Sequence, residues 1–406
     1  MRILVAWLAL LALTQTCPAA DNDRPDLKSL YDARRWFALR DSLARGAAPI
    51  FYQGAVACSF NDVHRCERKL GAVIKSRPRS DEAVEAHRVL ASVYLRQGKY
   101  REALAEVDAV LALRPGDSDT GNVRPLLATL SEFPDQEVLR RPSTTLKLND
   151  EGLPISINGE QGTYWFDTGA NYSILSESDA KRFGLAVRRV STKIGVSTGA
   201  QVDSRVAVAD EVSVGSIRLK HVAFLVFPDD KPPFNEAPQG SRGLIGIPVL
   251  LAFQRFVWGS DRKFEIDAKS VRKHVAHANL CFDGNTPVTL IQFESRSLAF
   301  VVDTGATSTD LYPPFAAAFP DLIRNSARTD SYKTEGVGSV KYMDAATLAS
   351  LHFRIGGFPV VLSPAAVLLT HTTETSKFFH GNLGIDLLQQ SHKTAFDFKA
   401  MTLTLQ

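Results

Sequence analysis

One four-residue phrase, Asp-Thr-Gly-Ala, occurs twice in this chain and constrains its fold more than any other feature. The copies begin at Asp167 and Asp303, and each directly follows an apolar run with the composition of a buried strand. A strand that ends in Asp-Thr-Gly presents a carboxylate at a tight turn. If the two turns faced each other, they would form a pair of carboxylates that cannot both ionise cheaply.

A second matched segment follows each copy of the phrase at nearly the same spacing. Gly246 follows the first Asp, within Gly-Leu-Ile-Gly-Ile-Pro-Val-Leu-Leu, and Gly384 follows the second, within Asn-Leu-Gly-Ile-Asp-Leu-Leu. Each segment leads into an alternating apolar stretch, at positions 256–266 and 394–405. A phrase, a gap and an ending that recur together indicate two copies of one structural unit.

Both units are predicted to be rich in β-strands. Residues 205–209 and 211–215 alternate with the period of two that a half-buried strand requires, and Gly, Pro, Asn and Asp separate such runs. Residues 360–369 form a longer apolar strand candidate. The apolar segments after Gly246 and Gly384 predict one short helix in each unit.

The paired motifs resemble those of the retropepsin-like aspartic peptidases, over about residues 144–406. The resemblance implies a small closed β-barrel in each lobe, a flap hairpin over a cleft, and a water molecule held between Asp167 and Asp303. Retroviral enzymes build such a site from two identical chains, whereas this chain carries both lobes. We expect the first lobe (lobe 1) to span positions 144–270 and the second lobe (lobe 2) to span positions 281–406, with a linker at 271–280.

The resemblance also implies roles for the residues beside each Asp. The two carboxyls would share one proton; the ionised carboxyl takes a proton from water and the protonated one donates to the substrate carbonyl. The sequence leaves open which Asp carries the proton. Thr168 and Thr304 are expected to brace the turns by hydrogen bonds across the lobe interface, and Gly169 and Gly305 to let backbone amides approach the carboxylates.

Ala170 and Ala306 complete the two phrases and offer no hydroxyl to the carboxylates. Pepsin-like chains carry Ser or Thr at that point, and its hydroxyl stabilises the ionised form. The loss of that hydrogen bond should raise the pKa of the pair. We therefore expect a pH optimum milder than that of pepsin.

Glycine pairs mark two candidate flap tips, Gly195 with Gly199 and Gly336 with Gly338. Glycine at a hairpin tip permits a positive φ and lid motion, although either pair could also be an ordinary hairpin turn. The sequence leaves open whether one flap or both cover the substrate. Residues 195–199 also match the Gly-x-Ser-x-Gly nucleophile elbow, but a strand-like segment follows where that motif needs a helix.

The N-terminal part, residues 20–120, is predicted to be α-helical. Residues 86–115 fit the tetratricopeptide spacing, residues 54–78 fit it more loosely, and residues 27–44 supply one more helix. We expect residues 121–143 to link this region to lobe 1. The helical region could bind a protein partner or serve as a cap docked on the lobes, and the sequence favours neither.

Residues 1–19 have the pattern of a secretory signal peptide. Arg2 precedes the apolar stretch 3–13, which is too short to span a bilayer comfortably, and small residues permit cleavage before Ala20. Lipidation of Cys17 is a weaker alternative, because the residues before it are a poor lead-in. We expect a periplasmic or secreted protein with no membrane span after signal removal.

The remaining cysteines and the charge restrict other functions. Cys58 and Cys66 could pair in an oxidising compartment or remain two buried thiols, and Cys281 has no evident partner. His274 and His277 lie near Cys281, but a solvated linker is favoured over a metal site because no fourth ligand is evident. The net charge of +3, with no basic run among aromatics, gives no support for nucleic-acid binding.

These observations predict a multidomain α and β chain, in which an α-helical repeat region precedes two tandem retropepsin-like closed β-barrel lobes. The expected activity is that of an aspartic endopeptidase acting on polypeptides, without a metal or another cofactor. The alternative is a non-enzymatic peptide-binding or protein-binding module, in which the helical repeats hold a partner and the cleft is catalytically silent.

Overall fold

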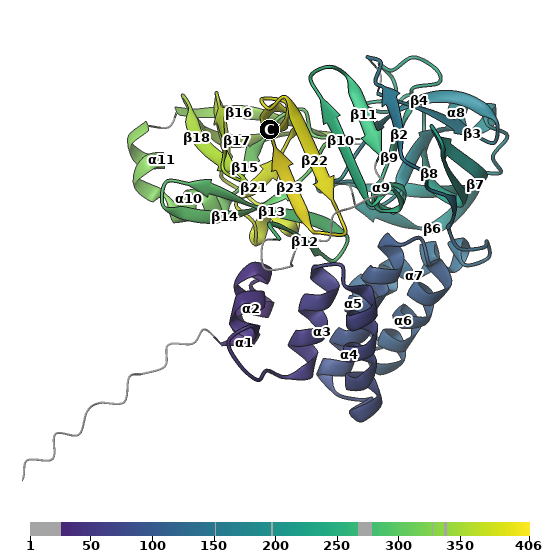
Figure 1. The fold of residues 1–406 in the computed structure, drawn as a ribbon, viewed down its shortest axis with the longest axis horizontal. Coiled ribbons are helices and arrows are strands. Elements are labelled where there is room, and N and C mark those ends of the chain that lie inside the picture. The colour runs from purple at the N-terminus through teal and green to yellow at the C-terminus, as the bar shows by residue number, and fades with distance from the viewer. Residues whose placement is uncertain (1–25, 151, 196–197, 267–277, 327, 337–338) are drawn as a thin grey trace, which may run out of the picture.

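The computed structural model of the 406-residue chain describes residues 26–150, 152–195, 198–266, 278–326, 328–336 and 339–406 (Figure 1). The predicted signal peptide, Cys17, His274 and His277 lie outside these residues. Within the described ranges, no helix has the length and apolar character needed to cross a membrane.

Seven helices, counted over the described residues, precede the lobes and form a layer below the strands in Figure 1. They are α1 (Leu27–Asp32), α2 (Trp36–Leu43), α3 (Ile50–Ser59), α4 (Val63–Ser76), α5 (Asp81–Arg96), α6 (Tyr100–Leu113) and α7 (Ser118–Leu130). Side-chain caps start several of them; Ser80 accepts a hydrogen bond from the Ala83 amide, and Asp117 accepts one from the Thr120 amide. Helices α3 to α7 pack each against the next along the chain, and the tetratricopeptide character of this stack stays a prediction.

Two sequence predictions for this region are wrong. The single helix expected in residues 27–44 is two helices, because the backbone turns at Arg34 with a φ of 53°. Residues 121–143 are not a plain linker, since they contain most of α7 and the strand β1 (Glu137–Arg140). The Asp117 cap starts α7, and burial of its leucines outweighs the turn-forming residues before it.

Lobe 1 forms a closed ring of strands. Its elements are β2 (Thr144–Lys147), β3 (Leu153–Ile157), β4 (Glu160–Phe166), β5 (Ser173–Ser176), α8 (Glu177–Arg182), β6 (Arg188–Gly195), β7 (Gln201–Val214), β8 (Ile217–Phe227), β9 (Gly243–Ile245), α9 (Ile247–Phe253), β10 (Arg255–Gly259) and β11 (Lys263–Ile266). The main sheet runs β1-β8-β5-β9-β4-β3-β7-β6, and an additional pairing of β7 with β8 closes it. This ring agrees with the barrel expected for lobe 1.

Lobe 2 repeats the arrangement with an open ladder. Its elements are β12 (Leu280–Asp283), β13 (Thr286–Phe293), β14 (Arg296–Val302), β15 (Asp310–Leu311), α10 (Pro313–Ala318), α11 (Pro320–Ser326), β16 (Arg328–Gly336), β17 (Ser339–Leu348), β18 (Leu351–Ile355), β19 (Phe358–Leu362), β20 (Ala365–Leu368), η2 (Thr375–Lys377), β21 (Gly381–Leu383), α12 (Ile385–Leu388), β22 (Lys393–Asp397) and β23 (Thr402–Leu405). The order β16-β17-β20-β15-β21-β14-β13-β18-β19, with β12 on β13, shows no closing pair among the described residues.

The closed barrel predicted for lobe 2 is therefore corrected. Lobe 1 has two long continuous strands, β7 and β8. In lobe 2 the first is divided into β17 and β18, and the second is divided into β19 and β20. Ser363 and Pro364 separate β19 from β20, and proline cannot donate a ladder hydrogen bond. The same break divides the single strand predicted at residues 360–369. Helices α9 and α12 confirm the short helices predicted after Gly246 and Gly384, and α8, α10 and α11 are additional helices of the lobes.

A five-stranded sheet, β2-β11-β10-β22-β23, joins the two lobes. It is made from the two alternating stretches noted in the sequence, each folded into a hairpin, together with β2. Strands β10 and β22 pair antiparallel, so Phe256 lies opposite Phe396 with the rings stacked at a centroid distance of 5.1 Å. Trp258 stacks on Phe396 at 5.7 Å. Such aromatic pairs add about 1 kcal/mol each beyond the burial of apolar area.

The helical region docks on both lobes. The buried Arg96 donates to the carbonyl oxygens of Gly284 at 2.8 Å and Cys58 at 2.5 Å, and its guanidinium lies 4.6 Å from the ring centre of Phe282. Gln136 donates to the carbonyl of Pro248 in lobe 1 at 2.8 Å. These contacts support the docking interpretation of the helical region.

The structure also settles the placement of the cysteines. Cys58 and Cys66 form a disulfide between α3 and α4. Cys281 is a buried free thiol in β12. No group of three or more His, Cys, Asp or Glu side chains in the described part of the chain is arranged to hold a metal ion.

Candidate active site

The two Asp-Thr-Gly turns occupy equivalent positions in the lobes. Each turn follows a strand, β4 or β14, that pairs in parallel with a short strand, β9 or β21, from the second matched segment. The amide of Asp167 donates to the carbonyl of Ile245 at 2.8 Å, and the amide of Asp303 donates to the carbonyl of Leu383 at 3.0 Å. The Asp-Thr-Gly phrase and the second matched segment thus recur together because the second segment forms the strand that supports the turn.

A reciprocal set of hydrogen bonds connects the turns across the lobe interface. The amide of Thr168 donates to Oγ1 of Thr304 at 3.0 Å, and the amide of Thr304 donates to Oγ1 of Thr168 at 3.1 Å. The Thr168 hydroxyl donates to the carbonyl of Val302 at 2.8 Å, and the Thr304 hydroxyl to that of Phe166 at 2.7 Å. Both threonines are 0% exposed, so these bonds form away from water.

The threonine pair brings the two carboxyl groups together. A Cβ atom at Gly169 would lie 2.5 Å from Cγ of Asp303, and a Cβ atom at Gly305 would lie 2.4 Å from Cγ of Asp167. Each carboxyl therefore rests against the glycine of the opposite turn, where no side chain fits. The glycines also act as donors, since the Gly169 amide binds Oδ1 of Asp167 at 2.7 Å and the Gly305 amide binds Oδ1 of Asp303 at 3.0 Å.

Close approach and burial raise the pKa of Asp167 well above its usual range. Burial is the largest cause, followed by the charge of Asp303 and the hydrogen bond between the two carboxyls; the amides of Gly169 and Ala170 oppose the rise. Asp167 keeps part of its own surface exposed, but dense packing around it still removes most of its hydration. The Asp167 carboxyl therefore keeps its proton to a higher pH than a free aspartate.

Gly246 and Gly384 support the turns from behind. The Gly246 amide donates to Oγ of Ser173 at 3.1 Å, and the Gly384 amide donates to Oγ1 of Thr309 at 2.9 Å. A Cβ atom at Gly246 would come within 2.4 Å of the Tyr172 carbonyl oxygen. These glycines permit close backbone packing behind the two turns.

One contact at the carboxylates was absent from the sequence prediction. Nδ2 of Asn382 donates to Oδ2 of Asp303 at 3.0 Å. Leu244 occupies the equivalent position in lobe 1, between Gly243 and Ile245. The replacement of an apolar residue by Asn within an otherwise matched repeat was the signal that could have found it.

The flap candidates lie in two hairpins, β6–β7 in lobe 1 and β16–β17 in lobe 2. Gly195 ends β6 and Gly336 ends β16, while Gly199 has a φ of 80°; Gly338 lies outside the described residues. The hydroxyl of Thr198 is hydrogen-bonded to that of Ser339, so the two hairpins meet. Strand β7 follows Gly199, which removes the helix that a nucleophile elbow requires.

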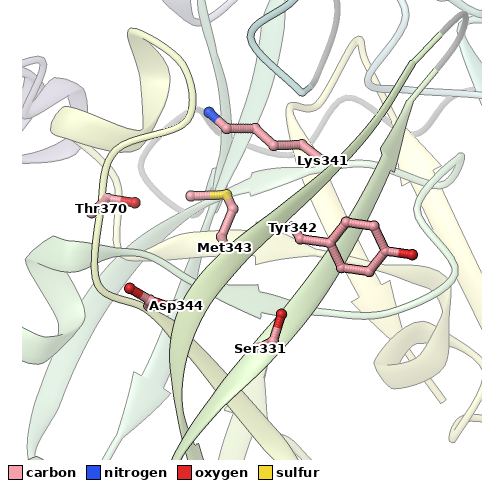
Figure 2. Close-up of a pocket in the computed structure, with 6 residues that line it drawn as sticks. All are labelled: Ser331, Lys341, Tyr342, Met343, Asp344 and Thr370. Atoms are coloured by element: carbon pink, nitrogen blue, oxygen red, sulfur yellow. The ribbon is translucent and has the colours of Figure 1, made fainter.

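A cavity of about 410 Å³ adjoins the lobe 2 hairpin (Figure 2), lined by Ser331, Lys341, Tyr342, Met343, Asp344 and Thr370. The side chains of Lys341 and Met343 extend from one side of β17 toward Thr370, and Tyr342 extends from the other side. Met343 lies opposite Tyr332, whose hydroxyl donates to Oδ1 of Asp310 at 2.5 Å. Burial raises the pKa of Asp310 to about 6.

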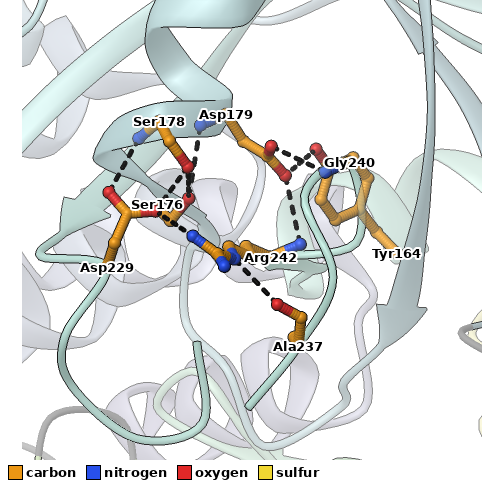
Figure 3. Close-up of polar contacts among 8 residues, drawn as sticks. All are labelled: Tyr164, Ser176, Ser178, Asp179, Asp229, Ala237, Gly240 and Arg242. Carbon is orange, nitrogen blue, oxygen red and sulfur yellow. Dashed lines mark hydrogen bonds and ion pairs between the residues drawn. The ribbon is translucent and has the colours of Figure 1, made fainter. Parts of the chain in front are cut away.

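Asp179 is a buried acid outside the dyad, and its carboxylate lies at the centre of a hydrogen-bond network in lobe 1 (Figure 3). Its carboxylate accepts hydrogen bonds from the Tyr164 hydroxyl at 2.8 Å, the Gly240 amide at 2.8 Å and the Arg242 amide at 3.1 Å. The Arg242 side chain in turn donates to Asp229 at 2.9 Å. This network fixes the segment that enters β9, the strand that supports Asp167 from behind.

Comparison with known proteins identifies the same part of the chain. A family model described as aspartyl protease matches residues 153–249, which include Asp167 and Gly246. This match supports an aspartic peptidase relationship. The chain is also similar to the crystal structure of a retropepsin-like aspartic protease from Rickettsia conorii, with 17% sequence identity and a TM-score of 0.23. The match covers 32% of this chain and 93% of that chain. No curated protein matches the chain.

The threonine pair generates a stability prediction. Thr304→Val keeps the side-chain shape but removes the acceptor for the Thr168 amide and the donor to Phe166, so the free energy of unfolding should fall by about 3 kcal/mol. Urea unfolding of the chain measures this change. Thr307→Val, at an exposed position of the same turn, is the matched control and should change stability by less than about 0.5 kcal/mol. Equal effects of the two substitutions would contradict the bracing role.

Proposed function

We propose that this chain is an aspartic endopeptidase that hydrolyses peptide bonds with a water molecule activated between Asp167 and Asp303. The observation that carries the proposal is the threonine set, which brings the two carboxyls against each other at the lobe interface. Two carboxyls held this closely share a proton, so one serves as a base while the other serves as an acid. The aspartyl protease match over residues 153–249 supports the same chemistry.

The proposed reaction needs only these two groups and water. The ionised carboxyl removes a proton from water as the oxygen attacks the peptide carbonyl carbon, and the protonated carboxyl donates its proton to the carbonyl oxygen. The C–N bond then breaks as the amine nitrogen takes the proton that came from water, and one hydroxyl of the tetrahedral intermediate gives its proton to the other carboxylate, which restores the singly protonated pair. Hairpins β6–β7 and β16–β17 are the proposed flaps over a bound polypeptide, since their tips meet at Thr198 and Ser339.

The remaining parts of the proposal concern the setting of the enzyme. We propose that the chain is exported and acts in the periplasm or outside the cell, because residues 1–19 have the pattern of a signal peptide. The disulfide between Cys58 and Cys66 is compatible with an oxidising compartment. The helical region is proposed to serve first as a docked cap, and any protein partner would bind on the faces that remain outside the lobe contacts.

The test of the proposed activity uses substitutions in both lobes. Asp167→Asn and Asp303→Asn should each reduce cleavage of a denatured protein mixture by at least about 10³-fold, because either change removes the acid–base pair. Mass spectrometry of the products measures cleavage and identifies the cut sites. Asp321→Asn, at an exposed carboxylate of α11 outside the dyad, is the control and should retain activity. Equal inertness of wild type and both dyad variants would favour the silent binding module.

The raised pKa of Asp167 generates a prediction for pH dependence. Activity requires that the pair of carboxyls hold one proton. In a profile of activity against pH, the rise on the acid side (the acid limb) therefore follows loss of the first proton, and the fall on the alkaline side (the alkaline limb) follows loss of the second. Because the Asp167 pKa is raised, the alkaline limb should extend toward neutral pH and the optimum should lie above about pH 4. The pH profile of kcat/KM measures this.

Two further variants test the cause of the predicted pH optimum. Ala170→Ser and Ala306→Ser restore a hydroxyl beside the carboxylates, which stabilises the ionised form. Each should move the acid limb to lower pH. A wild-type optimum at about pH 2–3, or an acid limb unaffected by either serine, would contradict the argument that the alanines set the pH range.

A further inference from the structure

The two carboxyls of the proposed dyad have different hydrogen-bond donors. Asp303 accepts from the amides of Gly305 and Ala306 on Oδ1, at 3.0 and 3.1 Å, and from Nδ2 of Asn382 on Oδ2 at 3.0 Å. Asp167 accepts from backbone amides, with the Gly169 amide at 2.7 Å. Among the described residues, the side-chain amide donor is thus found on the Asp303 side of the pair.

The difference arises at one matched position of the repeat. Asn382 is the middle residue of β21 and lies opposite Val301 in β14. Leu244 is the middle residue of β9 and lies opposite Trp165 in β4. The two strands have the same position relative to their Asp-Thr-Gly turns. The lobes therefore differ here in the side chain, an amide donor in lobe 2 and an apolar group in lobe 1, and not in the backbone pairing.

A carboxamide N–H in this place distinguishes the two charge states of the carboxyl. It can donate to a carboxylate oxygen but cannot accept the proton of a carboxylic acid, so it stabilises the ionised form. A hydrogen bond to a charged acceptor is also stronger than one to a neutral group. The donor therefore lowers the free energy of the state with the negative charge on Asp303, and Leu244, at the matched position beside Asp167, cannot donate.

We propose that Asn382 is a positioning residue that holds the negative charge of the pair on Asp303, so that Asp167 carries the shared proton when substrate binds. This inference rests on the proposed peptidase function and assigns the two roles within it. The Asp303 carboxylate takes the proton from the attacking water, and the Asp167 carboxyl donates its proton to the peptide carbonyl oxygen. Each proton thus has one donor and one acceptor.

Other titratable side chains lie around the pair of carboxyls. In the part of the chain that the structure describes, the titratable side chains that interact electrostatically with Asp303 are Asp167, Asp310 and Tyr312. Tyr332 and Asp386 interact in turn with Asp310. Asp310 lies opposite Asn382 in the sheet, and burial raises its pKa to about 6, so below that pH its carboxyl is mostly neutral. Tyr332 donates to Asp310, and the amide and hydroxyl of Thr309 donate to Asp386, so these donors serve other acids. The side-chain amide of Asn382, by contrast, donates to Asp303 itself.

The test places Asn382→Leu, which gives lobe 2 the residue of lobe 1, into two backgrounds with a single dyad acid. In Asp167→Asn only Asp303 of the pair titrates, and in Asp303→Asn only Asp167 titrates. Infrared difference titration of the carboxyl band, which needs no turnover, measures each ionisation. Asn382→Leu should raise the ionisation midpoint by about one pH unit in the Asp167→Asn background and leave it unchanged in the Asp303→Asn background.

A second readout uses the intact dyad. Asn382→Leu should move the acid limb of the kcat/KM profile to higher pH by about one unit while KM at the optimum changes little, and Asn382→Gln should restore part of the shift. If Asn382→Leu fails to fold by circular dichroism, Asn382→Ala takes its place. Equal infrared shifts in both backgrounds, or none in either, would overturn the assignment. Absence of cleavage by wild type would count against the proposed function alone, because the infrared titration still decides where the charge lies.

Discussion

The reciprocal hydrogen bonds between Thr168 and Thr304 are the interaction on which the rest of this structure depends. They form only if two turns that are distant in sequence meet face to face, with both threonines buried. Their buried amides would lose partners if either lobe moved away, and an unpaired buried donor costs about 1–3 kcal/mol. The bonds that hold the lobes in register are therefore also the bonds that force the two carboxyls together.

The surrounding fold supports this arrangement both directly behind the turns and from more distant elements. Gly246 and Gly384 let short strands pack directly behind the turns, and the Asp179 network fixes the segment that leads into one of those strands. The sheet that contains β10 and β22 joins the two lobes, and the helical region contacts both lobes through side chains such as Arg96 and Gln136. The hairpins β6–β7 and β16–β17, proposed above as flaps, would meet the opposite requirement, since a peptidase cleft must open to admit a polypeptide.

Sequence reasoning predicted the features that repeat and missed those that break the repeat. The Asp-Thr-Gly turns, the short helices after Gly246 and Gly384 and the two hairpins follow from patterns that occur twice. The open ladder of lobe 2 depends on an interruption at Pro364, and the hydrogen bond of Asn382 requires Asp303, a neighbour that is remote in sequence. Helix α7 was hidden because its burial against other elements, and not its local composition, stabilises it.

The most direct test of the central claim is the affinity of a peptide in which a hydroxyethylene unit replaces the cleaved amide. Its hydroxyl takes the place of the attacking water between Asp167 and Asp303, as in a transition state. Isothermal calorimetry should show binding to wild type at least about 100-fold tighter than to Asp167→Asn or Asp303→Asn. Equal affinity for all three proteins would show that the carboxyls do not act as a pair, and would contradict the account.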